Sequence, residues 1–216
     1  MATLENAELG KGGKYEAVVS TENIPVVSWK NLTVYTSDSY QQIFKNGVSI
    51  LTGSGAVGGK AILNDLSGQI SGGFWGLMGP SGSGKTTLLN ALALRLDPLR
   101  MAKTGITAID GRPYRKRYLK KISGYVMQDD VLAVEYTIQE TLYYAAVLKL
   151  DLTKEERDRR IDEAIDLLGI SHRRDVIVGD SRRKGISGGE RKRLCIAIEL
   201  LAKPKLLFLD EPTSGD

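Results

Sequence analysis

Apolar and polar positions along the chain follow two periods, and their order predicts strands that alternate with helices. Short apolar runs rich in β-branched or aromatic residues predict strands at 26–35, 74–78, 106–109, 122–127 and 206–209. Apolar residues at helical spacing predict helices at 85–96 and 190–202, which Pro98 and Pro204 close. This alternation predicts an α/β fold with a mostly parallel sheet and helices on its faces.

Two more helices are marked by their first residues. Thr137 with Glu140, and Thr153 with Glu156, fit the capping box, in which each side chain hydrogen-bonds a backbone N–H that the helix leaves free. The second of these helices carries an apolar face and meets Gly169, a typical stop. We therefore expect helices to begin just after Thr137 and just after Thr153.

Composition narrows the class of protein. The 216 residues suffice for one globular domain, and we expect 1–27 to be a mobile tail, 28–216 the domain and the glycine-rich 47–59 a flexible insertion. The net charge of +4 is too small to indicate nucleic acid, and the single cysteine, Cys195, excludes an intrachain disulfide. Because no apolar run approaches the roughly 18 residues of a membrane span, we expect the chain itself not to cross a bilayer.

A glycine-rich segment between a predicted strand and a predicted helix matches the pattern GxxxxGK[ST]. It comprises Gly79, Pro80, Ser81, Gly82, Ser83, Gly84, Lys85 and Thr86, with Thr87 next to it. Glycines let successive backbone N–H groups point at phosphate oxygens, and the positive end of the following helix adds to the attraction. Lys85 can then reach the β and γ phosphates, and the Thr86 hydroxyl can bind Mg²⁺. The plainer interpretation, a glycine turn that only caps a helix, fits this context less well.

Two acids end the last apolar run. Asp210 and Glu211 follow 206–209, and the carboxyl ends of parallel strands face the ligand crevice in such a sheet. Asp210 would hold Mg²⁺, and Glu211 would act as general base or position the attacking water. Acids are common at the ends of strands, so this pattern alone is a weak signal. It indicates a nucleotide site here because a phosphate-binding segment precedes it in the sequence.

A second helix start is rich in small residues. Ser187, Gly188 and Gly189 precede the helix predicted at 190–202 and would expose backbone N–H groups to an anion, although such sequences are also common in loops. The cations that follow, Arg191, Lys192 and Arg193, oppose the helix dipole. They are favourable only with an anion or an acidic partner nearby.

In this order the motifs resemble the nucleotide-binding domain of an ABC transporter, subfamily G, the half-transporter type. The matches are 79–86 to Walker A, 206–211 to Walker B, 186–190 to the signature and Gln128 to the Q-loop. The resemblance implies a P-loop ATPase fold with an antiparallel β part near the N-terminus. It also implies a helical subdomain at about 129–186.

The resemblance further implies hydrolysis of MgATP between two paired cassettes to drive transmembrane transport. Lys85, Gln128 and Glu211 would be catalytic, and Thr86, Gln128 and Asp210 would hold the metal. Ser187, Gly188 and Gly189 would bind the γ phosphate of the opposite subunit, and Tyr35, if not simply a core residue, would stack on adenine. The implied partners are a second nucleotide-binding domain and a transmembrane domain outside this chain, at the cytoplasmic face of a membrane, with no nucleic acid.

Two departures from the family pattern keep alternatives open. Ser214-Gly215-Asp216 lacks the leucine of the family's D-loop, and the switch histidine has no counterpart. We therefore expect the C-terminal part of the nucleotide-binding domain, which carries that histidine, to be absent. One alternative is therefore a truncated nucleotide-binding remnant with little hydrolysis, and another is a soluble ABC ATPase that acts on nucleic acid. The basic residues between 112 and 121 could face an anionic surface but fit a solvated helix better.

Overall fold

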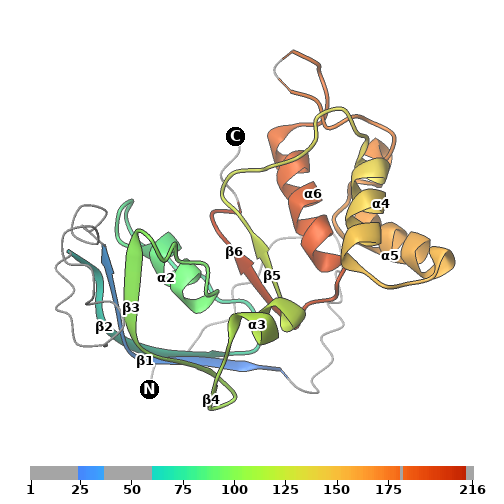
Figure 1. Ribbon diagram of the computed structural model, residues 1–216. Helices are drawn as coiled ribbons and strands as arrows, with labels where there is room; N and C mark the ends of the chain where they lie inside the picture. Colours follow the sequence, from blue (N-terminus) through green and yellow to red (C-terminus); the bar gives the residue numbers. More distant parts are fainter. Residues whose placement is uncertain (1–23, 37–59, 181, 213–216) are drawn as a thin grey trace, which may run out of the picture.

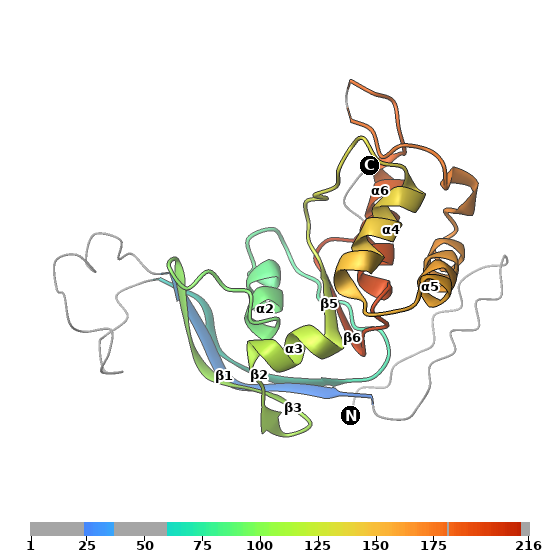
Figure 2. The same cartoon turned by 45° about the vertical axis from the view of Figure 1, so that its right-hand side comes forward.

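The structure is a computed structural model, and it describes residues 24–36, 60–180 and 182–212. In this part of the chain a curved antiparallel sheet and helix α2 lie on one side of a short parallel strand pair, β5–β6 (Figures 1 and 2). Helices α4, α5 and α6 gather on the other side of that pair. The expected insertion 47–59, most of the tail 1–27 and the D-loop positions 214–216 lie outside the described residues.

The antiparallel sheet contains β1 (Val26–Thr36), β2 (Ala61–Ser71), β3 (Met101–Ile109) and β4 (Arg112–Pro113) in the order β2-β1-β3-β4. β1 confirms the strand predicted at 26–35. Because β1 begins at Val26, residues 26 and 27 belong to this strand and not to the tail predicted at 1–27. β3 begins five residues before the predicted strand at 106–109. Its first residues pair with the end of β1, as in Thr36 with Met101, and such a partner is not visible in local periodicity.

The parallel pair is what positions the site. β5 (Ser123–Val126) and β6 (Leu206–Leu209) run in the same direction, with Ser123 opposite Leu206 and Val126 opposite Leu209. Both predicted strands are therefore confirmed. Because their carboxyl ends are level, the residues after Val126 and after Leu209 emerge side by side.

The strand predicted at 74–78 is wrong for this structure. These residues form no strand, and Phe74 and Met78 are 89% and 91% exposed. A strand needs a hydrogen-bonded neighbour, and no described strand pairs with this apolar run. The expected mostly parallel sheet is accordingly not found among the described strands, where β5–β6 is the one parallel pair.

Two helices belong to the sheet side of the molecule. α2 (Lys85–Leu92) follows the glycine segment, and α3 (Lys116–Ile122) precedes β5. α2 ends four residues before the predicted helix does, because Leu94 adopts a left-handed backbone (φ 53°) that breaks the helical hydrogen-bond series. Together with the sheet, these helices bury a sheet cluster, whose largest fully buried side chains are Leu32, Val27 and Val34.

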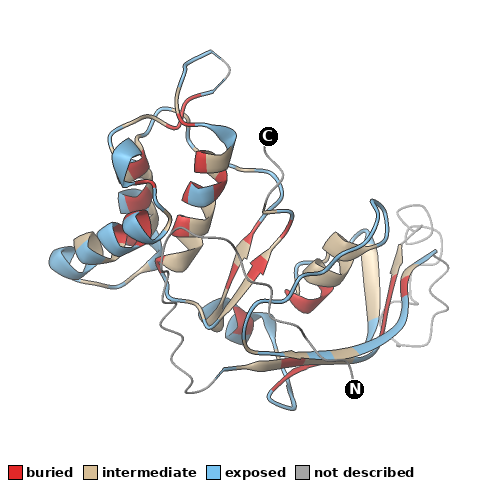
Figure 3. Cartoon of the chain, turned by 180° about the vertical axis from the view of Figure 1, so that it is seen from behind, coloured by how far each residue is buried: buried red, intermediate tan, exposed pale blue. Residues whose placement is uncertain are grey.

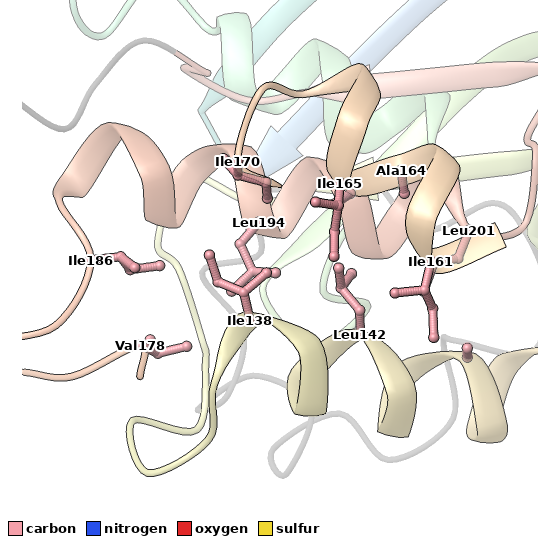
Figure 4. Packing of buried hydrophobic residues seen from close by; sticks show 12 residues of the cluster. Ile138, Leu142, Ile161, Ala164, Ile165, Ile170, Val178, Ile186, Leu194 and Leu201 are labelled. Carbon is pink, nitrogen blue, oxygen red and sulfur yellow. The ribbon is translucent and has the colours of Figure 1, made fainter. Parts of the chain in front are cut away.

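The remaining helices are α4 (Ile138–Lys149), α5 (Lys154–Leu167) and α6 (Gly188–Leu200), with the short 3-10 turn η1 at Ser171–Arg173. Both predicted capping boxes are confirmed at Thr137 and Thr153, and Gly169 has the left-handed φ of 63° expected of a helix stop. Their inward faces form a helical cluster, seen as the buried patches of Figure 3 and in detail in Figure 4. Its buried core includes Ile138, Leu142, Ile161, Ile165 and Leu194.

No helix in the described ranges is both long enough and apolar enough to span a bilayer.

Candidate functional site

The glycine segment forms a tight loop at the start of α2. Residues 79–84, called here the phosphate loop, include Gly82 and Gly84 with φ of 79° and 92°, a region that favours glycine. A Cβ on Gly84 would lie 2.8 Å from Leu63 Cδ2 on β2, so the loop lies close against the sheet at a point where only glycine fits. No side chain caps the N-terminus of α2, which leaves its first N–H groups available to an anion.

Lys85 folds back over this loop. Its Nζ donates hydrogen bonds to the main-chain oxygens of Gly79 and Pro80, each at 2.9 Å. The ammonium group is therefore held against the backbone of the loop, where a bound phosphate could accept its hydrogen bonds instead.

A hydrogen bond joins the phosphate loop's helix to the end of β6. The Thr86 hydroxyl donates to Asp210 Oδ1 at 2.9 Å, although the two residues are 124 positions apart. Asp210 is 7% exposed, and Tyr125 reaches its other oxygen at 3.5 Å. A hydroxyl and a buried carboxylate are oxygen ligands of the kind that Mg²⁺ prefers, so these residues fit the predicted metal.

Tyr125 is held protonated beside this carboxylate. Burial of the phenol, followed by the charge of Asp210, raises the pKa of Tyr125 to about 12. Its single hydroxyl proton points to the nearer acceptor, Asn90 Oδ1 on α2 at 2.9 Å, and the Arg95 guanidinium lies 4.5 Å from the centre of its ring. The sequence pattern did not single out Tyr125, since a tyrosine in a short strand is usually read as core.

Gln128 and Glu211 meet beyond the ends of the parallel pair. The Gln128 Nε2 donates to Glu211 Oε2 at 2.8 Å, across 83 positions of sequence. Glu211 has a left-handed backbone with φ of 47°, which is uncommon for a residue with a Cβ and is typical of functional sites. The structure thus joins Thr86 to Asp210 and Gln128 to Glu211, four of the residues that the sequence singled out.

Ser187 and its neighbours lie elsewhere. Ser187 is the N-cap of α6, which begins at Gly188, and Figures 1 and 2 show α2 and α6 on opposite sides of β5–β6. The Ser187 hydroxyl donates to Glu190 Oε2 at 2.9 Å, and Glu190 N donates back to Ser187 Oγ at 3.3 Å. This third capping box was missed in the sequence, although it has the same Ser/Thr-x-x-Glu pattern as the other two.

Two features at the edge of the site complete its description. Tyr35 lies half-buried on β1 opposite Ala61, two residues from the Leu63 side chain that contacts the phosphate loop. In α6, Lys192 has an acidic partner of the kind that makes a cation favourable in the first turn, because its Nζ lies 2.7 Å from Asp130 Oδ1.

A glycine loop at a helix start, hydrogen-bonded to an acid at the end of a buried strand, defines the P-loop class of nucleotide-binding proteins. The comparisons with known proteins agree, because the family model described as ABC transporter matches residues 63–214. The chain belongs to the ABC transporter family, and it is an ATP-binding cassette, the ATPase domain of that family.

The relatives found belong to the G family. ABC transporter G family member STR of Petunia hybrida is 46% identical over 157 residues, which cover 71% of this chain and 19% of that protein. ABC transporter G family members 22 and 1 of Arabidopsis thaliana are 46% and 45% identical over 159 residues, 72% of this chain and 21% of each. The chain thus spans about a fifth of the length of the curated relatives it matches.

Proposed function

We propose that residues 79–87 bind the phosphates of MgATP and that Gln128 and Glu211 serve its hydrolysis. The observation that carries this proposal is the Thr86–Asp210 hydrogen bond, which joins the phosphate loop's helix to the strand end that presents Glu211. Thr86 and Asp210 would hold Mg²⁺, whose charge would offset that of the phosphates.

The phosphate contacts follow from the free donors of the loop. The uncapped N-terminus of α2 directly follows residues 79–84, and the Lys85 ammonium contacts the backbone of the same loop. On binding, Lys85 exchanges its two carbonyl partners for phosphate oxygens, which accept stronger, charge-assisted hydrogen bonds. The loop is therefore pre-shaped for a polyphosphate rather than for a neutral ligand.

Gln128 and Glu211 are proposed to act on the attacking water. Glu211 accepts the proton or orients the water, and the Gln128 amide, 2.8 Å from Glu211 Oε2, fixes the carboxylate. Gln128 would also help to hold the metal through its amide oxygen. Gln128 follows β5 and Glu211 follows β6, so both side chains would lie near the same γ phosphate.

The nucleotide's other contacts are proposed from the helix start at Ser187 and from β1. Ser187, Gly188 and Gly189 would bind the γ phosphate held by a second cassette, because they start a helix, α6, that lies across β5–β6 from α2 and the phosphate loop. Tyr35 would stack on the adenine ring, supported by its register two residues from the contact between Leu63 and Gly84.

The whole protein is proposed to be a G-family transporter half whose cassette drives transmembrane transport. In that assembly residues 28–216 are the cassette, and 129–186, which contain α4 and α5, are its helical subdomain. It would pair with a second nucleotide-binding domain and act on a transmembrane domain at the cytoplasmic face of a membrane. The relatives' names support this assignment and leave the transported substrate open.

Binding of a fluorescent ATP analogue to the 216-residue chain tests the site. We expect K85A to weaken binding by about 10- to 100-fold, because it removes charge-assisted hydrogen bonds to phosphate. K116A, which removes an exposed lysine of α3, is the matched control and should bind like the parent. Equal affinity of K85A and the parent, with both folded by circular dichroism, would refute the assignment.

A further inference from the structure

One buried cation of α6 reaches the loop that carries Gln128. The Lys192 side chain is 5% exposed, and its Nζ lies 2.7 Å from Asp130 Oδ1. The same Nζ donates to the main-chain oxygens of Gln128 at 2.7 Å and of Met127 at 3.2 Å. The two carbonyl oxygens accept hydrogen bonds, whereas Asp130 Oδ1 lies at ion-pair distance without a hydrogen bond.

Residues 127–130, called here the Gln128 loop, depend on such contacts for their position. They form neither helix nor strand, so no regular backbone pairing fixes them beyond Val126. Lys192 holds the carbonyl oxygen of the very residue whose side-chain amide contacts Glu211 at 2.8 Å. Fixing that carbonyl limits the positions that the amide can reach.

Lys192 and Asp130 form an ion pair in which each charge is balanced by the other. Asp130 has a side chain that is 14% exposed, and an ion pair this far from water is strongly destabilised when one partner is removed. The Cys195 thiol also faces Asp130, but burial first and the Asp130 charge second raise its pKa to about 12. The thiol therefore stays neutral, and Lys192 supplies the charge that balances Asp130.

We propose that Lys192, on α6, is a positioning residue that holds the Gln128 amide against Glu211. The proposal rests on the proposed function, because it gives Lys192 a role in turnover only if Gln128 and Glu211 act in ATP hydrolysis. The printed contacts of Lys192 are to the backbone of Met127 and Gln128 and to Asp130, so its role is argued through the Gln128 loop. It also links the start of α6, where Ser187 lies, to the Gln128–Glu211 pair.

The test is a double-mutant cycle on the 216-residue chain. K192M, Q128A and K192M/Q128A are compared in single-turnover ATP hydrolysis and in MgATP binding by calorimetry. K149M is the matched control: Lys149 also forms an ion pair, at 2.6 Å with Glu199 of α6, and Glu199 contacts the backbone of Tyr125 in β5 rather than residues 127–130. K192M/D130N is made alongside, since it removes both charges and avoids an unpaired buried carboxylate.

We expect K192M to lower the hydrolysis rate constant by about 10- to 100-fold while the Kd for MgATP changes by less than about twofold. Q128A should give a similar loss, and the double variant should be no slower than the worse single one. Hydrogen exchange of residues 127–131 should be at least about tenfold faster in K192M and in K192M/D130N, but unchanged in K149M.

Each result decides a separate point. Losses that multiply in K192M/Q128A, or unchanged exchange at 127–131, overturn the positioning role and leave the proposed function standing. A parent chain that gives no heat with MgATP overturns the proposed function. In that case the exchange measurement still shows whether Lys192 holds the Gln128 loop.

Discussion

Glu190 shows how completely one buried carboxylate can be used at the start of a helix. Its Oε2 accepts hydrogen bonds from Ser187 N and Oγ at 2.8 and 2.9 Å. Its Oε1 accepts from Arg173 Nε at 3.1 Å and lies 3.4 Å from His172 Nε2. The hydrogen bond from the Ser187 backbone is the largest of the effects that lower the pKa of Glu190 to about 2.

This pKa shift predicts a specific loss of stability in acid. The folded state holds Glu190 ionised down to pH of about 2, whereas the unfolded chain takes up the proton near 4.5, so the stabilisation is present above 4.5 and lost as the pH falls towards 2. The neutral amide of E190Q cannot replace the charged carboxylate that accepts both Ser187 hydrogen bonds. Its deficit in free energy of unfolding relative to the parent, from urea titrations, should therefore be largest at neutral pH and narrow in acid. A deficit independent of pH would contradict the shift.

A second prediction at this scale concerns Glu211. E211Q keeps the size of the side chain but removes its ability to accept a proton, so turnover should fall by at least about 100-fold while MgATP still binds. Binding by calorimetry and hydrolysis by phosphate release, measured on the same preparation, separate the two effects. Hydrolysis by E211Q at the parent's rate would show that Glu211 neither accepts the proton nor needs its charge.

At the scale of the residue, the sequence could predict which residues carry the chemistry of the site better than which residues hold them in position. Thr86, Gln128, Asp210 and Glu211 belong to motifs with a known mechanism, and the structure joins them in two hydrogen-bonded pairs. The role of Lys192 could not be predicted, because its partners lie 64 and 65 positions away and only the fold brings them together.

At the scale of the element, local chemistry determines where helices begin more reliably than where strands form. All three Ser/Thr-x-x-Glu sequences at 137, 153 and 187 form capping boxes, since both partners lie within four residues of each other. The segment 74–78 has the composition of a strand but no pairing partner among the described strands. A strand depends on a remote neighbour, and composition does not supply one.

The capping box of α5 gives a prediction for a single element. T153A removes the hydroxyl that accepts from Glu156 N at 3.3 Å, and it should lower the free energy of unfolding by about 1 kcal/mol. T153S keeps the hydroxyl and is the control, expected within about 0.3 kcal/mol of the parent. Both values come from urea denaturation followed by far-ultraviolet circular dichroism. An equal loss in both variants would assign the effect to the methyl group of Thr153 instead.

At the scale of the whole molecule, the described residues bury two hydrophobic clusters that share no buried member. The sheet cluster lies with β1, β2, β3 and α2, and the helical cluster with α4, α5 and α6. Polar contacts connect them across β5, including Tyr125 N to Glu199 Oε2 at 3.4 Å and the Lys192 contacts to the Gln128 loop. The proposed catalytic pair, Gln128 and Glu211, lies along this connection. A shift of one cluster against the other would therefore move the Gln128 loop.

Two separate clusters predict two units of local unfolding. L142A empties space in the helical cluster, and L32A does the same in the sheet cluster. Both side chains are 0% exposed, so each change should cost about 2–5 kcal/mol. Hydrogen exchange followed by mass spectrometry should show L142A accelerating exchange mainly in α4, α5 and α6, and L32A mainly in β1, β2 and β3. If either variant accelerates exchange equally in both regions, the clusters unfold as one unit. The polar contacts across β5 then couple them more strongly than the separation of their buried cores implies.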